Sequence, residues 1–217
     1  MMSDWAALFD WDGVIIDSAA THERSWERLA AEHNLPLPDD HFLRGFGMRN
    51  EVIIPEILRW TQDPYRIRQL SLRKEALYRE VIREEGVIPL PGVTTYLQSL
   101  SAAGIPCVVA TSTHRANVET ILDVLDFRSY FHDMVSSEDV RRGKPDPEVF
   151  LLAAQKAGHP PASCVVFEDA HHGIQAAKAA NMSAVGVLTT HPGGKLAGAD
   201  RLVDRLDQLP LDGRRPA

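Results

Sequence analysis

The sequence is poor in the features that mark secreted, membrane-spanning and nucleic-acid-binding proteins. Its 217 residues include only two cysteines, Cys107 and Cys164, each inside an apolar run, so we expect two buried, reduced thiols and no disulfide framework. No apolar stretch is long enough to cross a bilayer, and no signal peptide is recognisable. A formal net charge of −7 without a lysine or arginine run argues against a nucleic-acid-binding surface. These absences predict a cytoplasmic soluble protein that binds neither membranes nor nucleic acid, and we expect it to be a monomer.

The second half of the chain alternates regularly between short apolar runs and helical patterns. Apolar residues make up 44% of the sequence, which is ample for a core. Near-continuous apolar strands that alternate with helices form parallel sheets covered on both faces, so the predicted fold class is α/β with a doubly wound, Rossmann-like parallel sheet. The expected strands span residues 6–8, 105–110, 134–136, 164–167 and 184–188, and the expected helices span 93–103, 115–125, 147–157 and 173–180.

Between the first strand and this alternation lies a long segment with helical patterns and no strand pattern. One helix is expected over residues 19–33, and a longer one begins at the capping pair Asp63-Pro64. We interpret the segment as an inserted, all-helical cap domain. The predicted division is a core domain of residues 1–17 and 89–217 and a cap domain of residues 18–88.

The stretch FDWDGVIIDS, from Phe9 to Ser18, places two carboxylates at the end of the first strand. Residues two apart on extended backbone project to the same side, so Asp10 and Asp12 can face one pocket. Two crowded acids repel each other unless a cation or a proton relieves them, so the pair predicts a metal site, a proton-transfer task or both. A structural alternative is that these residues only form the turn that follows the strand.

Polar residues also follow three later strands, and parallel strands bring their carboxyl ends to one edge of a sheet. They are Thr111-Ser112-Thr113, Lys144 between a glycine and a proline, and Glu168-Asp169. Each has a structural alternative: the hydroxyls and the acids can cap the helices that follow, and the lysine can be a solvated surface group. We favour a common site, because the structural alternatives require all these groups to meet on one rim by accident.

This set of groups predicts a site for phosphoryl transfer. Mg²⁺ prefers oxygen ligands, which Asp10, Asp169 and Glu168 can supply. Hydroxyls, backbone amides and an ammonium suit the remaining phosphate oxygens. A carboxylate can also act as the nucleophile and form an aspartyl-phosphate.

Four segments in order resemble the motifs of the haloacid dehalogenase superfamily, most closely its phosphatase and beta-phosphoglucomutase-like subgroup. They are FDWDGVIIDS, ATST at Ala110–Thr113, GKPDPE at Gly143–Glu148 and FEDAHHGIQAA at Phe167–Ala177. The resemblance covers essentially the whole chain. It implies a Rossmann-like core with a mobile helical cap, and an enzyme that acts on phosphoric monoesters with Mg²⁺.

The resemblance also implies roles for individual residues. Asp10 would be the nucleophile and Asp12 the general acid and base. Thr111 and Lys144 would contact the phosphate, with Ser112 beside them as a substrate-binding hydroxyl. Mg²⁺ would be held by Asp10, the carbonyl of Asp12 and Asp169, with Glu168 adjacent. Dehalogenases of this superfamily lack the second acid, so Asp12 argues against that activity.

In the cap, HERSW resembles the H-x-x-x-W segment of beta-phosphoglucomutases, and its His22 and Trp26 share one helical face. Arg49 and Lys74 resemble cap residues that contact the substrate. We therefore predict His22, Arg49 and Lys74 as substrate-binding residues. The alternatives left open are packing inside the cap for the two aromatic rings and ordinary solvation for the two cations.

Three functions follow from these motifs, and they belong to different classes. The first is a Mg²⁺-dependent phosphatase that acts on a small phosphorylated metabolite, such as a sugar phosphate. The second is a beta-phosphoglucomutase-like isomerase, in which the phospho-aspartate returns its phosphoryl group to another sugar hydroxyl. The third is a signalling receiver domain, which the order of the motifs and the helical insert disfavour.

Overall fold

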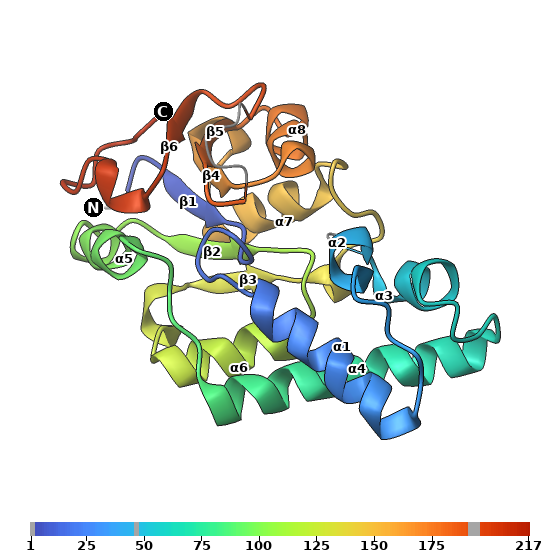
Figure 1. Cartoon of the computed structure of the whole chain (residues 1–217). Helices are drawn as coiled ribbons and strands as arrows, with labels where there is room; N and C mark the ends of the chain where they lie inside the picture. The colour runs from blue at the N-terminus through green and yellow to red at the C-terminus, as the bar shows by residue number, and fades with distance from the viewer. Residues whose placement is uncertain (1–2, 46–47, 191–195) are drawn as a thin grey trace. The chain divides into compact units, whose positions relative to one another are not determined.

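The computed structural model describes residues 3–45, 48–190 and 196–217, and the chain divides into two units (Figure 1). One unit, the core, contains Met1–Asp17 and Val87–Ala217, and the other, the cap, contains Ser18–Gly86.

The core is built on a parallel sheet of six strands in the order β3-β2-β1-β4-β5-β6. Phe9, the last residue of β1, lies opposite Val109 of β2 and opposite Phe167 of β4. The chain fills one half of the sheet from β1 outward and then returns to start the other half at β4, so the predicted doubly wound fold class is confirmed. The strands are β1 (Ala6–Phe9), β2 (Cys107–Ala110), β3 (Asp133–Val135), β4 (Cys164–Glu168), β5 (Ser183–Val187) and β6 (Arg201–Val203).

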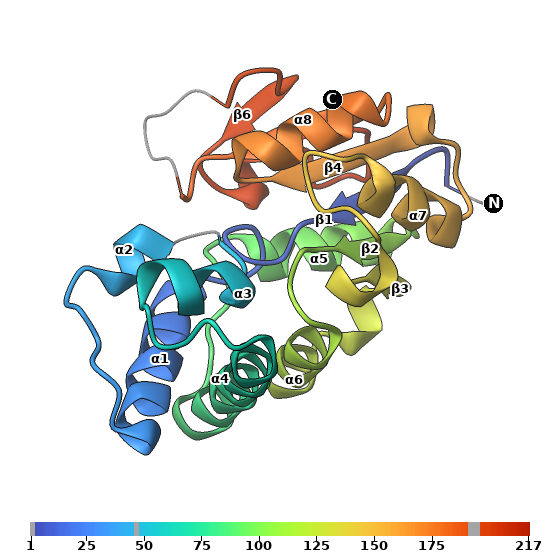
Figure 2. The same ribbon diagram turned by 90° about the vertical axis from the view of Figure 1, so that its right-hand side faces the viewer.

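Helices cover both faces of this sheet (Figures 1 and 2). Helices α7 and α8 pack on one face, where Phe150 and Ile174 join a buried cluster with Leu8, Val108 and Val166. Helices α5 and α6 lie on the opposite face, as expected when right-handed crossovers run outward from a central strand in both directions. The core helices are α5 (Val93–Ala102), α6 (Arg115–Leu125), α7 (Glu148–Ala157) and α8 (His171–Ala179).

An aromatic cluster fixes the ends of the two central strands. The rings of Phe9 and Phe167 stack with centroids 4.5 Å apart, and Tyr96 of α5 meets both edge-on, at 6.5 Å and 5.6 Å. All three residues are fully buried. Edge-to-face and stacked aromatic pairs stabilise a fold beyond their buried area. The residues that follow Phe9 and Phe167 therefore start from a rigid position.

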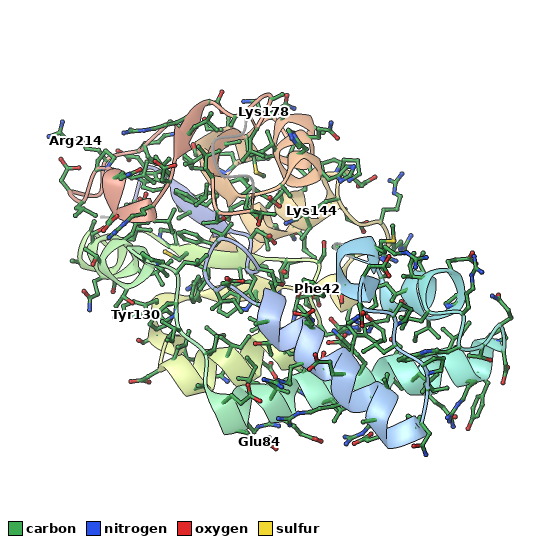
Figure 3. All side chains as sticks on the ribbon, viewed as in Figure 1. Phe42, Glu84, Tyr130, Lys144, Lys178 and Arg214 are labelled. Carbon is green, nitrogen blue, oxygen red and sulfur yellow. The ribbon has the colours of Figure 1, made fainter. Side chains whose placement is uncertain are left out.

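Within its described residues, the cap contains helices and no strands. Helices α1 and α4 are its largest elements. Glu84, near the end of α4, is labelled in Figure 3, and it pairs with Arg28 of α1 at 2.7 Å. The side chain of Asp63 caps α4 by accepting a hydrogen bond from the amide of Tyr65, as the sequence predicted. The cap helices are α1 (Ala19–His33), α2 (His41–Gly45), α3 (Asn50–Val52) with a π-helical turn (Ile53–Ile57), and α4 (Pro64–Glu85).

The two places where the chain passes between the units are paired within the core. Ile16 forms an antiparallel bridge with Pro89, and the amide of Leu90 donates to the carbonyl of Ile15 at 2.9 Å. The chain thus leaves the core and re-enters it through two adjacent backbone segments.

Strand β6 was not predicted. It is only three residues long, and its central residue, Leu202, is 41% exposed, so Arg201–Val203 carry no apolar run.

The prediction for the cysteines is confirmed: both are free and buried, and burial raises the pKa of Cys107 to about 12 and that of Cys164 to about 11. No helix in the described part of the chain combines the length and apolarity that a membrane span requires.

Candidate active site

The polar groups predicted from the sequence lie at the switch point of the sheet, where β1 and β4 run side by side. In an open α/β sheet, ligands bind outside the carboxyl ends of the strands at this point. Because Phe9 pairs with Phe167, Asp10 emerges next to Glu168, and the amide of Asp10 donates to the carbonyl of Phe167 at 3.0 Å. The register alone therefore places the first motif against the last one.

Lys144 joins the two strand ends. It belongs to the loop between β3 and α7 and is labelled in Figure 3, and its Nζ donates to Oδ1 of Asp10 and to Oε1 of Glu168, each at 2.7 Å. Its side chain is only 8% exposed, and Nζ also lies 5.0 Å from the ring of Phe150. Burial lowers the pKa of Lys144, but the charges of both carboxylates outweigh burial and raise it overall. Lys144 is therefore a charged group inside the site, and the solvated-surface alternative is wrong.

Glu168 is held from both sides. Its Oε1 accepts from Lys144 and its Oε2 accepts from the amide of Ala170 at 2.7 Å. A Cβ on Gly173 of α8 would overlap the carboxylate of Glu168, so only a glycine at position 173 leaves room for this carboxylate. Burial raises the pKa of Glu168 overall, although the charge of Lys144 acts in the opposite direction. Glu168 thus acts in this structure as the partner that orients Lys144, and its predicted role as a metal ligand stays a prediction.

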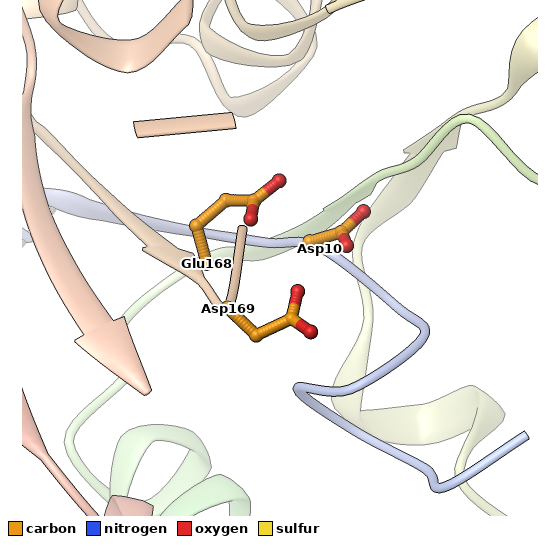
Figure 4. Close-up of side chains that lie close together, drawn as sticks. All are labelled: Asp10, Glu168 and Asp169. Atoms are coloured by element: carbon orange, nitrogen blue, oxygen red, sulfur yellow. The ribbon is translucent and has the colours of Figure 1, made fainter. Parts of the chain in front are cut away.

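Three carboxylates, Asp10, Glu168 and Asp169, lie close together (Figure 4). One oxygen from each lies within 4.8 Å of the others. Burial, followed by the charges of Asp10 and Glu168, raises the pKa of Asp169 to about 8. An all-oxygen donor set whose members repel one another is what a hard divalent cation binds. The residues present therefore fit the predicted Mg²⁺.

Asp12 and the segment after β2 meet at the same edge. Thr113 donates its hydroxyl hydrogen to Oδ2 of Asp12 at 2.5 Å, and the amide of Thr113 donates to Oγ1 of Thr111 at 3.1 Å. Oγ1 of Thr111 accepts this bond, and its own hydrogen has no acceptor among the described residues, so it can donate to a ligand. Thr111 is buried, whereas Ser112 is exposed and makes no hydrogen bond with its side chain within the described residues.

These hydroxyls do not cap α6. The N-cap residue of that helix is His114, whose side chain makes no capping hydrogen bond, and the amide of Arg115 is bonded instead to the carboxylate of Glu138. The capping alternative for Thr111-Ser112-Thr113 is therefore wrong. Thr113, which belongs to the predicted motif but was given no role of its own, orients Asp12.

In the cap, the structure brings together two of the three predicted substrate-binding residues. Nζ of Lys74 lies 2.7 Å from Nδ1 of His22 and 3.0 Å from Oε1 of Glu75. Desolvation, followed by the charge of Lys74, lowers the pKa of His22 to about 3, against an opposing effect of Glu75. An ammonium can only donate, so Nδ1 of the neutral ring accepts and Nε2 carries the hydrogen.

Further side chains support this cluster of His22, Lys74 and Glu75, which we call the cap cluster. The ring of His22 stacks on Tyr78 with centroids 4.3 Å apart, and Nζ of Lys74 lies 5.5 Å from the rings of Trp26 and Tyr78. Asn50 donates to Oε1 of Glu75 at 2.7 Å. Lys74 is 2% exposed, so the solvated-cation alternative is wrong for this residue.

Arg49 is not part of the cap cluster. It is exposed and occupies the N-cap position of α3, immediately before the buried Asn50. Its predicted contact with the substrate stays a prediction.

Two site residues that we did not predict follow β5. Thr190 donates its hydroxyl hydrogen to Oδ2 of Asp169, and Thr189 donates to the carbonyl of Gly13. A signal was present in the sequence, because two adjacent hydroxyl residues follow a fifth apolar strand whose carboxyl end belongs to the same edge of the sheet.

Known proteins match this chain over most of its length. A family model described as haloacid dehalogenase-like hydrolase matches residues 6–181. The chain is 36% identical over 208 residues to the chloroplastic 5-amino-6-(5-phospho-D-ribitylamino)uracil phosphatase of Arabidopsis thaliana, covering 94% of this chain but only 55% of that protein. It is 35% identical over 180 residues to the fructose-1-phosphate phosphatase of Escherichia coli, covering 83% of this chain and 94% of that protein.

A mutase and a solved structure match as well. The beta-phosphoglucomutase of Bacillus subtilis is 34% identical over 215 residues, covering 95% of this chain and 92% of that protein. The crystal structure of CbbY from Rhodobacter sphaeroides in complex with phosphate superposes with a TM-score of 0.84 at 25% identity, covering 96% of each chain.

The matches bear on two of the predictions made from the motifs. The superfamily and its phosphatase and beta-phosphoglucomutase-like subgroup are confirmed. An enzyme of the phosphoric monoester hydrolase class is confirmed by the family and by relatives named as phosphatases. With the family model covering most of its length, the chain belongs to the haloacid dehalogenase-like hydrolase family.

Proposed function

We propose that this enzyme is a Mg²⁺-dependent phosphatase that hydrolyses a small sugar phosphate through an aspartyl-phosphate on Asp10. The observation that carries the proposal is the position of Lys144, which holds Asp10 against Glu168 while Asp12 lies two residues further along the same strand end. The substrate class is supported by relatives named for phosphorylated carbohydrates. The predictions of a monomer and of a cytoplasmic location remain predictions.

In the first step, a carboxylate oxygen of Asp10 attacks the phosphorus atom. Oδ1 of Asp10 is bonded to Lys144, whereas its Oδ2 makes no hydrogen bond with any described residue and retains its lone pairs for attack. A bond forms between this oxygen and phosphorus, the bond from phosphorus to the sugar oxygen breaks, and Asp12 gives its proton to that oxygen. The hydroxyl hydrogen of Thr111 and the ammonium of Lys144 bind the phosphoryl oxygens.

In the second step, water attacks the phospho-aspartate. Asp12, now a carboxylate, accepts a proton from the water, and the bond between phosphorus and Asp10 breaks. The hydrogen bond from Thr113 keeps Asp12 in one orientation through both steps. The site regains its starting protonation state and releases inorganic phosphate.

Asp10, Asp169 and the carbonyl of Asp12 would hold Mg²⁺, with Glu168 beside them as the orienting partner of Lys144. Bound Mg²⁺ supplies positive charge that neutralises the phosphoryl oxygens. His22, Arg49 and Lys74 would select the sugar from the cap.

A beta-phosphoglucomutase-like isomerase is the alternative function. It is favoured by the mutase relative and by the cap cluster, because a mutase must recognise its sugar while excluding water from the phospho-aspartate. In that case the sugar hydroxyl, rather than water, takes the phosphoryl group from Asp10.

One assay separates the two reactions. Purified enzyme with Mg²⁺ is given beta-glucose 1-phosphate and catalytic glucose 1,6-bisphosphate, and both glucose 6-phosphate and free phosphate are followed. Steady phosphate release from this and other sugar phosphates supports the phosphatase. Rapid formation of glucose 6-phosphate with negligible phosphate release contradicts it and establishes the isomerase.

A further inference from the structure

Two consecutive threonines tie the last metal-site carboxylate to the first motif. Thr189 and Thr190 follow β5, which pairs with β4 so that Gly186 lies opposite Glu168. Thr190 donates to Oδ2 of Asp169, and Thr189 donates to the carbonyl of Gly13. The pair therefore binds the segments after β1 and β4 at the same place.

The turn at Gly13 leaves no spare room around this contact. Gly13 has φ +79°, in the left-handed region, and a Cβ there would overlap the Asp169 carboxylate and lie 2.9 Å from Oγ1 of Thr190. The carboxylate of Asp169, a residue that is 5% exposed, thus lies against the Gly13 turn and accepts from the hydroxyl of Thr190. The hydroxyl of Thr189 links the two neighbours, because it donates to the carbonyl of Gly13.

Such a contact determines how the carboxylate is presented. The terminal torsion of an aspartate is broad, so an unsupported carboxylate samples many orientations. The hydrogen bond from Thr190 to Oδ2 selects one of these orientations. The directions of the remaining lone pairs of Asp169 are then set as well. Hydrogen bonds to ligating carboxylates typically change metal affinity by about 10- to 100-fold.

We propose that Thr190 is a positioning residue that holds Asp169 ready for Mg²⁺, and that Thr189 supports it by fixing the Gly13 turn. This inference rests on the proposed function, since it assigns a role toward the same metal. Thr190 acts through Asp169 and has no part in the chemical steps.

The test is Mg²⁺ binding measured by isothermal titration calorimetry on the full-length wild type and three variants. Thr190→Val keeps the shape and removes the hydroxyl, Thr190→Ser restores the hydroxyl, and Thr95→Val changes an exposed threonine of α5 as the matched control. We expect Thr190→Val to bind Mg²⁺ about 10- to 100-fold more weakly, and the other two variants to match the wild type within about threefold. The Mg²⁺ concentration that half-saturates p-nitrophenyl phosphate hydrolysis should rise by the same factor, with kcat at saturating Mg²⁺ nearly unchanged.

Two results overturn the inference, and they differ in whether they also contradict the proposed function. If Thr190→Val binds Mg²⁺ as tightly as the wild type, Thr190 has no positioning role and the proposed function stands. If the wild type itself does not bind Mg²⁺, the metal site and this role fall together. Melting curves in EDTA show whether each variant is folded, and Thr190→Ala replaces Thr190→Val if the valine variant does not fold.

Discussion

The core site and the cap cluster are each built around a buried lysine, but they surround it with different charges. Lys144 in the core faces Asp10 and Glu168, and Asp169 lies alongside them. Lys74 in the cap faces the carboxylate of Glu75 and the neutral ring of His22. Both ammonium groups lie near aromatic rings, but Lys144 donates to two carboxylates, whereas Lys74 contacts a carboxylate and an imidazole.

This difference assigns the two regions different tasks. Where carboxylates outnumber the lysine, repulsion among them is relieved by a further cation, and the site is ready for a metal and for the charge of a phosphoryl group. In the cap cluster the charges of Lys74 and Glu75 offset each other, and the cluster presents hydrogen-bonding groups. The core is therefore expected to determine whether phosphoryl transfer occurs, and the cap to determine on which substrate. The following experiments test that division, beginning with the largest effect.

Asp10→Asn should remove activity on every substrate. The amide keeps the shape of the side chain but lacks the charge needed for attack, so we expect turnover to fall to background, by about a thousand-fold or more. The measurement is phosphate release from sugar phosphates and from p-nitrophenyl phosphate. Asp4→Asn, at an exposed aspartate of the same unit, is the control. A variant that keeps a tenth of wild-type turnover removes Asp10 from the role of nucleophile.

Asp12→Asn should affect substrates according to their leaving groups. General acid and base catalysis typically contributes about a hundred- to ten-thousand-fold, and we expect that loss with sugar phosphates. Formation of the phospho-aspartate from p-nitrophenyl phosphate needs little protonation and should suffer less, as measured by the burst of p-nitrophenolate in rapid-mixing assays. Equal losses of the first step with both leaving groups count against the acid role.

His22 should make folding stability depend on pH. Because its pKa is lowered to about 3 in the folded chain, the unfolded chain binds a proton below about pH 6.5 that the folded chain does not. Stability contributed by the neutral ring is thus present above pH 6.5 and lost as the pH falls, by up to about 1.4 kcal/mol per pH unit. Urea unfolding at pH 7, 6 and 5 should show the wild type losing this stability relative to His22→Gln.

The control for this measurement is His172→Gln, at an exposed histidine of α8. Its unfolding free energy should follow that of the wild type at all three pH values. If the His22→Gln variant also follows the wild type, the ring of His22 is not held neutral by the cap cluster.

Arg49→Ala should have the smallest effect and a selective one. Loss of a single hydrogen bond from a charged group costs about tenfold in kcat/KM for the natural sugar phosphate, while p-nitrophenyl phosphate should be hydrolysed as by the wild type. Arg44→Ala is a matched control in the same unit, since Arg44 is exposed and pairs with Asp40 at 3.5 Å. If Arg49→Ala lowers activity on both substrates equally, its role is structural.

Most of the fold could be predicted from the sequence because its signals are local. The apolar runs before Asp10, Thr111 and Glu168 are the strands that the structure contains, and α1 and α6 have the predicted bounds. Strand β6 escaped because a short edge strand with an exposed leucine has no apolar run, and its pairing with β5 depends on the rest of the sheet. A hydrophobic pattern in the sequence therefore identifies a strand or helix only where the side chains of that element are buried.

The candidate site could be predicted for its charged residues and for the hydroxyls that follow β2, but not for the contacts that these groups make with one another. Asp10, Lys144 and Glu168 were identifiable because carboxylates and a lysine at strand ends indicate chemistry. The orienting roles of the hydroxyl groups on Thr113 and Thr190 could not be assigned in this way, although both residues follow strands, because threonine is also an ordinary strand, turn and cap residue. Which of several threonines points at an aspartate is decided by the three-dimensional packing around Gly13 and Asp12.

The pairing of Ile15 and Ile16 with Pro89 and Leu90 has a consequence for how such enzymes can diversify. Since the chain leaves and re-enters the core at adjacent backbone positions, the core sheet is complete without regard to what lies between Ser18 and Gly86. Any insert whose two ends meet at the spacing of paired backbone can be grafted there without rerouting a strand. If the cap selects the substrate, as proposed above, exchanging this insert would change the substrate while the residues of the core site stay the same.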